Sequence, residues 1–158
     1  CFSQALTTFI GQNLGAKEYD RAKKGALFGT ICGIGIAEVI GIAVFFFSPY
    51  LIAAFGGDQR AIEYGIAEAH TIALFYCLLA FSHCMAAIQR GAGRSIVPMF
   101  VMMLVWCGVR VTYISIVIRI IPVINVIYWA YPLTWFISSV IFLILFLKTD
   151  WIHGLEKQ

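Results

Sequence analysis

Long apolar runs separated by short charged segments make up most of the chain. These runs lack the strict alternation of apolar and polar positions that is typical of membrane β-strands. Runs of roughly 20 apolar residues are long enough for a helix to cross the bilayer. The pattern predicts an all-α membrane protein, a polytopic helical bundle with four complete transmembrane helices and the end of a fifth. The expected segments are the end of a helix at 1–16, a loop at 17–24, helices at 25–48, 69–89, 95–118 and 124–147, and a tail at 148–158.

The composition excludes a soluble domain. Hydrophobic residues make up 61% of the 158 positions, charged residues make up 12%, and the mean hydropathy is +0.90. A soluble globular protein has about a quarter of its residues charged. The net charge of +3 is too small and too scattered to indicate nucleic-acid binding. The five cysteines form no CxxC pair and the chain has no catalytic grouping, so we expect neither a metal site nor enzyme activity.

The basic residues between the apolar runs predict the orientation, because cytoplasmic loops retain Lys and Arg. Successive connections carry four, one, two, one and two of them. They are Lys17, Arg21, Lys23 and Lys24, then Arg60, then Arg90 and Arg94, then Arg119, and finally Lys148 and Lys157. This alternation predicts that the first connection, the third connection and the C-terminus are cytoplasmic. Ser48 and Pro49 should close the helix at 25–48 near its outer end.

Glu38, Arg110 and His83 are ionisable residues near the middle of predicted spans, where a charge costs a few kcal/mol or more. Glu38 and Arg110 lie about 20 Å and about 22 Å from the inner ends of helices that run in the same direction. They could form a buried pair, or Glu38 could face a central cavity as a proton or cation site. Alternatively, Arg110 extends toward the interface and Glu38 is protonated in a shielded niche. His83 could titrate near physiological pH, or it could simply be hydrogen-bonded within the bundle.

Small residues recur at every fourth position of the span at 25–48. This spacing lets another helix approach closely, which favours packing where lipid removes the hydrophobic incentive. Static packing and a surface on which helices slide past each other are both compatible with the pattern. The residues are Gly25, Gly29, Gly33, Ala37 and Gly41.

Two short segments at the predicted cytoplasmic ends of spans are similar to motifs of one transporter family. The run GQNLGAKEYDRAKKG begins at Gly11, and the turn IQRGAGRSIVPMF begins at Ile88. They resemble segments that multidrug and toxic compound extrusion (MATE) transporters carry where the second helix of each lobe meets the cytoplasm and between the tenth and eleventh helices. The order and spacing of the two segments match the C-terminal lobe of that family. The motif residues are Gly11, Gln12, Asn13, Gly15, Ala16 and Arg21 in the first segment, and Arg90, Gly91 and Gly93 in the second.

The resemblance implies a twelve-helix transporter of two six-helix lobes in a prokaryotic inner membrane, with this chain as most of the second lobe and the N-terminal lobe as its partner. The activity implied is export of amphipathic or cationic compounds in exchange for Na+ or H+, with no other cofactor. Many members bind the coupling ion through a tenth-helix carboxylate, whereas the span at 69–89 has no Asp or Glu. Other members use an Asp in the first helix of the N-terminal lobe. Within this sequence, the coupling candidates are Glu38 and His83. The alternatives are a lipid-linked oligosaccharide flippase of the same superfamily and a structural membrane fragment without transport.

Overall fold

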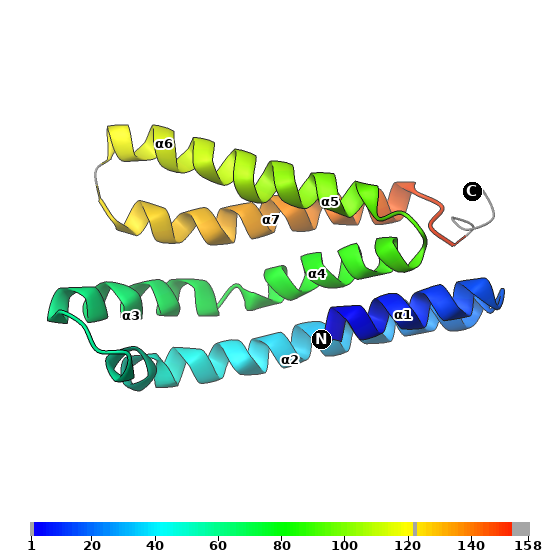
Figure 1. Ribbon diagram of the computed structural model, residues 1–158, viewed down its shortest axis with the longest axis horizontal. Helices are drawn as coiled ribbons and strands as arrows, with labels where there is room; N and C mark the ends of the chain where they lie inside the picture. The colour runs from blue at the N-terminus through cyan, green and yellow to red at the C-terminus, as the bar shows by residue number, and fades with distance from the viewer. Residues whose placement is uncertain (1, 122, 153–158) are drawn as a thin grey trace.

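The computed structural model describes residues 2–121 and 123–152, which form a bundle of helices (Figure 1). No strand occurs among these residues, so the prediction of an all-α membrane protein is confirmed. One span contains a π-helical segment, η1, between two α-helical segments. The elements are α1 Phe2–Gly15, α2 Tyr19–Ala54, α3 Gln59–Ala73, α4 Tyr76–Gly91, α5 Ile96–Met102, η1 Met103–Val109, α6 Arg110–Ile120 and α7 Asn125–Lys148.

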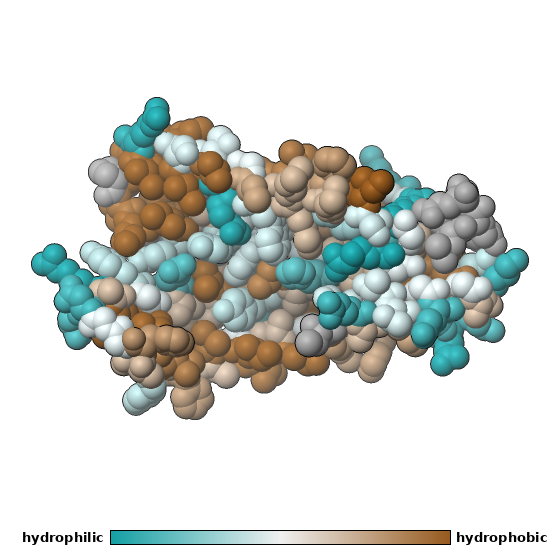
Figure 2. Space-filling model, in the orientation of Figure 1, coloured by the Kyte–Doolittle hydropathy of each residue, from teal (hydrophilic) through white to brown (hydrophobic). Residues whose placement is uncertain are grey.

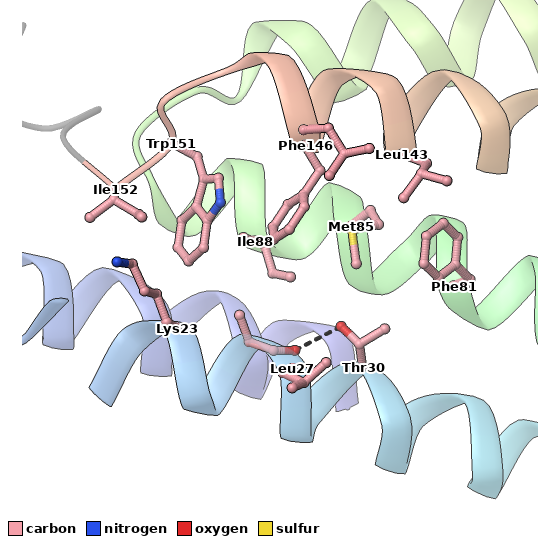
Figure 3. Close-up of a pocket in the computed structure, with 12 residues that line it drawn as sticks. Lys23, Leu27, Thr30, Phe81, Met85, Ile88, Leu143, Phe146, Trp151 and Ile152 are labelled. Carbon is pink, nitrogen blue, oxygen red and sulfur yellow. Dashed lines mark hydrogen bonds between the residues drawn. The ribbon is translucent and has the colours of Figure 1, made fainter. Parts of the chain in front are cut away.

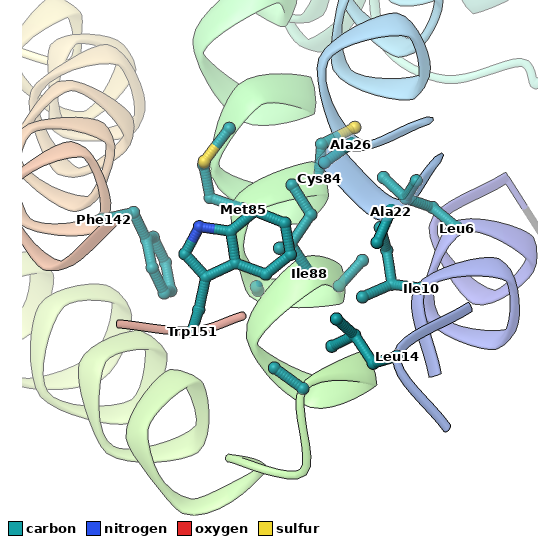
Figure 4. Packing of buried hydrophobic residues seen from close by; sticks show 13 residues of the cluster. Leu6, Ile10, Leu14, Ala22, Ala26, Cys84, Met85, Ile88, Phe142 and Trp151 are labelled. Atoms are coloured by element: carbon teal, nitrogen blue, oxygen red, sulfur yellow. The ribbon is translucent and has the colours of Figure 1, made fainter. Parts of the chain in front are cut away.

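The helices lie in three layers, and α4 is the centre of the arrangement. In Figure 1, α1 and α2 form one layer, α3 and α4 the next, and α5, α6 and α7 the third. Helix α4 packs against α1, α2 and α7. The apolar core surrounds α4, where Ile88 is fully buried between Ile10 of α1 and the rings of Phe142 and Trp151 (Figure 4).

Several helices meet the requirements for crossing a membrane. The described residues include three helical segments that are long and apolar enough to do so, Tyr19–Ala54, Ile96–Ile120 and Val126–Lys148. Helices α3 and α4 together make a fourth, bent by 58° at the break between them. Apolar side chains cover wide areas over α2 and over the α6–α7 end of the molecule in Figure 2. Exposed apolar surface on this scale is stable only in contact with lipid or with further protein.

The second span is longer than predicted at both ends. Helix α2 begins at Tyr19, so Arg21, Lys23 and Lys24 lie in its first turns and not in a loop. It also continues through Pro49 to Ala54. A proline lacks the N–H that would bond the carbonyl four residues earlier, which here is that of Phe45. The hydroxyl of Ser48 donates to this carbonyl at 3.3 Å, which explains why the helix does not end at the proline.

The span predicted at 69–89 is instead two helices. The segment before it forms α3, in which Ile62 and Ile66 are half-buried and the charged side chains of Arg60 and Glu63 are exposed. At the break, the Phe75 N–H bonds Ile72 O at 3.0 Å in place of a bond of the α-helical type. The prediction missed α3 because the charges of an amphipathic helix look like those of a loop.

The last two spans lie close to their predicted positions. Residues 96–120 form one continuous rod of α5, η1 and α6, and α7 begins at 125 and ends at 148. The chain after α7 turns back, and Trp151 packs on the core with its ring stacked on Phe146 at 5.4 Å between centroids. Of the predicted tail at 148–158, residues 153–158 lie outside the described part of the chain, as does Cys1.

Candidate functional site

The first motif segment forms the end of α1. The Glu18 N–H donates to Asn13 O at 2.9 Å, and the Lys17 N–H donates to Leu14 O at 3.1 Å. This pair of bonds is a Schellman motif, in which the residue after the C-cap adopts the left-handed conformation. That residue is Lys17, with φ of 60°, and not Gly15, which the sequence suggested as the end of the helix. The side chain of Asn13 is buried and donates to Phe9 O at 2.7 Å.

The second motif segment forms the same turn at the end of α4. The Arg94 N–H donates to Gln89 O at 2.9 Å, and the Gly93 N–H donates to Arg90 O at 3.0 Å. Gly93 occupies the left-handed position with φ of 80°. The segments Gly15-Ala16-Lys17 and Gly91-Ala92-Gly93 are therefore equivalent stretches of two helix C-termini. The shared Gly-Ala sequence is the signal in the chain that indicates this relationship.

The two motif helices also pack directly on each other. A Cβ atom on Gly91 would lie 2.7 Å from Thr7 O, and one on Gly11 would lie 3.4 Å from Gly91 O. The hydroxyl of Thr7 donates to Ala87 O at 3.2 Å across the same contact. Close backbone approach thus accounts for a glycine at both positions. The remaining motif side chains lie at the surface or near it: Gln12, Ala16 and Arg21 are exposed, and Arg90 is half-buried.

The glycines of α2 face three different neighbours. Gly25 lies against the ring of Phe9, and a Cβ on Gly29 would lie 2.7 Å from Leu6. A Cβ on Gly33 would lie 2.7 Å from Cys84 Sγ in α4. Gly41 receives the closest backbone approach, with Ala73 O only 2.5 Å from the position of a Cβ. The stripe therefore brings α1, α4 and the end of α3 close to one face of α2.

Arg110 has neutral and aromatic neighbours within the third layer. Its Nη2 donates to Thr134 Oγ1 at 2.8 Å, and its guanidinium carbon lies 4.3 Å from the centroid of the Tyr131 ring. The Nε atom is buried without a hydrogen-bond partner. Cation–π contact and a charge-assisted hydrogen bond both stabilise a desolvated guanidinium.

Glu38 lies in the first layer beside the α3–α4 break. Its side chain is half-buried, and Oε2 is buried without a hydrogen-bond partner. The carboxyl group lies near the thiol of Cys77 and interacts with it electrostatically. Gly41, which contacts Ala73, is one turn further along the same face of α2. The site thus combines a carboxylate, a thiol and the backbone end of α3.

The structure does not pair Glu38 with Arg110. Among the described residues no ion pair joins the two, and each has the separate surroundings given above. Helix α4 lies between the layers that carry them (Figure 1). Similar depth along parallel helices was the basis of the pairing hypothesis, but depth does not determine which helices are neighbours.

The sequence comparison decides the family. The sequence model of the MatE family matches residues 1–116, which include both motif segments, Glu38, His83 and Arg110. The chain belongs to the MatE family. It is also 29% identical, over 99 residues, to the probable multidrug resistance protein NorM of Thermotoga maritima. The alignment covers 63% of this chain and 21% of NorM, so the chain matches about a fifth of that relative's length.

In this MatE chain, α7, which lies outside the matched range, forms a polar cluster with α4 that was not predicted from the sequence. The hydroxyl of Ser82 in α4 lies 2.9 Å from the hydroxyls of both Ser138 and Ser139. Ser139 also donates to Leu78 O at 3.1 Å. These bonds join α4 to α7 near mid-length. Consecutive serines in an apolar run were the available signal, since buried hydroxyls need partners.

His83 of the MatE segment lies apart from the thiol of Cys77 and the bend beside Glu38. It lies six residues beyond Cys77, about 9 Å along α4 at the helical rise. Its ring meets the edge of Trp106 at 5.4 Å between centroids. It also lines a cavity of about 260 Å³ together with Gly33 and Ala37. Of the two coupling candidates, only Glu38 adjoins the bend.

Proposed function

We propose that this chain is most of the C-terminal lobe of an antiporter that exports amphipathic or cationic compounds in exchange for Na+ or H+. Membership of the MatE family and the similarity to a protein named for multidrug resistance support transport of this kind. The N-terminal lobe forms the other wall of the substrate cavity. The basic ends of α1, α4 and α7 face the cytoplasm, as the distribution of Lys and Arg predicts.

The observation that carries the coupling proposal is the unpartnered Oε2 atom of Glu38 in a span beside a bent helix. A buried carboxylate oxygen without a hydrogen-bond partner is costly, and binding a proton or a cation removes that cost. Transporters commonly bind coupling ions with acidic side chains and with carbonyl groups at the ends of broken helices. Glu38 is the acidic group in this site, and Ala73 O is a carbonyl of the broken helix that lies against Gly41 on the same face of α2.

Coupling follows from the position of this site at the bend. Ion binding neutralises Glu38 and stabilises the packing of α3 against α2. Ion release leaves a negative charge on the half-buried Glu38, which favours a different position of the α3 end. An ion that binds one conformation more tightly shifts the population toward it, and alternating access requires such a shift.

The test measures transport by the full-length protein in proteoliposomes under imposed Na+ or H+ gradients. Glu38→Gln keeps the size of the side chain but removes its negative charge. We expect gradient-driven efflux of a cationic dye to fall at least tenfold, while dye binding to the purified protein changes less than twofold. The matched control is Glu63→Gln, because Glu63 is an exposed carboxylate on α3 outside the site.

The comparison of the two variants decides the role of Glu38. Efflux by Glu38→Gln at the rate of Glu63→Gln would remove Glu38 from the coupling mechanism. An unmodified protein that moves no cationic or amphipathic dye under either gradient would contradict the antiport function itself.

A further inference from the structure

An apolar cavity lies at the basic end of the bundle, apart from Glu38. Its volume is about 520 Å³, within the range of small-molecule sites. It opens to the surface and is lined by α2, α4, α7 and the segment after α7, which contribute Leu27, Met85, Leu143 and Trp151 (Figure 3). None of the proposed coupling residues lines it.

Among the described residues that line the cavity, Lys23 is the only charged side chain. Thr30 also lines the cavity, but its hydroxyl donates to Ala26 O at 2.8 Å. The ammonium group of Lys23 extends toward Ile152 at the end of the cavity (Figure 3). Lys23 has no hydrogen bond or ion pair to another described residue. A fitting ligand therefore has a long apolar body and a negative charge at one end.

Trp151 and Ile152 cover this charged end of the cavity. The Trp151 ring is stacked on Phe146, at 5.4 Å between centroids and an angle of 27°. The guanidinium of Arg94 donates to Asp150 O at 3.3 Å, which holds the returning segment beside the end of α4. Trp residues favour the boundary between acyl chains and headgroups. The cavity accordingly begins at that boundary and extends toward the bilayer interior.

We propose that this cavity binds one acyl chain of an anionic phospholipid, whose phosphate contacts the ammonium group of Lys23. The adjacent exposed side chains of Arg21 and Lys24 give this end of α2 the basic character that attracts acidic lipids. An amphipathic cation would place its charge beside Lys23, so charge complementarity disfavours a drug of the exported class. The site lies in the cytoplasmic leaflet in the orientation proposed above, but the test of lipid binding does not depend on transport.

The test measures phosphatidylglycerol bound to the full-length purified protein by native mass spectrometry. Lys23→Gln should weaken binding about fivefold more than Lys24→Gln does, the effect expected for one basic group at a membrane surface. Lys24 is the matched control because it is exposed on the same turn and does not line the cavity. Equal effects of the two substitutions would overturn the proposal, because they would indicate a general surface attraction.

A second pair of variants tests occupancy of the cavity itself. Leu27 lines the cavity and is 66% exposed, so Leu27→Trp places an indole ring in the cavity. Phe28→Trp places an indole ring at the neighbouring position, which does not line the cavity. We expect only Leu27→Trp to abolish phosphatidylglycerol retention. Phosphatidylglycerol with brominated acyl chains should also quench the fluorescence of Trp151. That contribution is identified as the part of the emission that is lost in Trp151→Phe. Retention by Leu27→Trp equal to that of Phe28→Trp, or equal quenching by net-neutral phosphatidylcholine, would refute an anionic-lipid site.

Discussion

The carbonyl oxygen of Ala73 lies 2.5 Å from the position that a Cβ atom on Gly41 would occupy. This contact brings the last turn of α3 against the backbone of α2, at the bend in the fourth span. It lies one helical turn from Glu38. The glycine thus has a structural role that determines how closely a helix end can approach the candidate coupling carboxylate.

Gly41→Ala should destabilise the protein by about 1–3 kcal/mol, because a backbone atom must shift to admit the methyl group. The control is Gly35→Ala, where a Cβ meets nothing within 4 Å and the helix gains about 0.5–1 kcal/mol. Thermal unfolding of the purified full-length variants checks both values. If Gly41→Ala unfolds at the temperature of Gly35→Ala, the contact in the structure is not present in the membrane protein.

The two Schellman turns predict opposite effects of exchanging their left-handed residues. Lys17→Gly should stabilise the end of α1 by about 1 kcal/mol, since glycine removes the steric cost of φ near 60°. Gly93→Ala should destabilise the end of α4 by a similar amount, because φ there is 80°. Hydrogen exchange at the Glu18 and Arg94 amides, which close the turns, measures each effect locally. Changes of the same sign at both turns would contradict their equivalence.

The Ser48 hydroxyl should stabilise the protein only while Pro49 is present. Ser48→Ala leaves the Phe45 carbonyl without its hydroxyl donor, which costs about 1–3 kcal/mol. In the double variant with Pro49→Ala, the N–H at position 49 can bond that carbonyl, so most of the loss should be recovered. A double-mutant cycle of unfolding free energies measures this coupling. Additive effects of the two substitutions would show that the Ser48 hydroxyl does not replace the missing bond.

Thr134→Val should destabilise the protein by about 1.5–3 kcal/mol, the range for hydrogen bonds to charged groups. The substitution removes the acceptor of Arg110 Nη2 and leaves the guanidinium with its aromatic contacts. Thr134→Ser keeps the hydroxyl and should retain most of the stability. Thr112→Val, at an exposed position of α6, is the matched control. Equal melting temperatures for the two valine variants would exclude a stabilising bond from Arg110.

The chain's membrane character and family were predictable because they depend on local features. An apolar run must span the bilayer as a helix, since backbone polar groups find no partners in lipid. The extent of α7, from 125 to 148, could therefore be predicted to within one residue. The Gly-Ala segments are likewise local, and the match to the MatE family confirmed the resemblance that they indicated.

The contacts between helices depended on the tertiary structure. The sequence predicts how deep a residue lies along its helix, but not which helices are neighbours. Helix α4 separates the layers that contain Glu38 and Arg110, and Arg110 binds Thr134 on α7. The bend beside Glu38 lacks a Gly or Pro signal, since Leu74 and Phe75 form it. Which segments enter the membrane follows from the amino-acid sequence, because burial in lipid is a property of each segment. Which polar groups meet follows from the packing of distant segments, which the three-dimensional structure reveals.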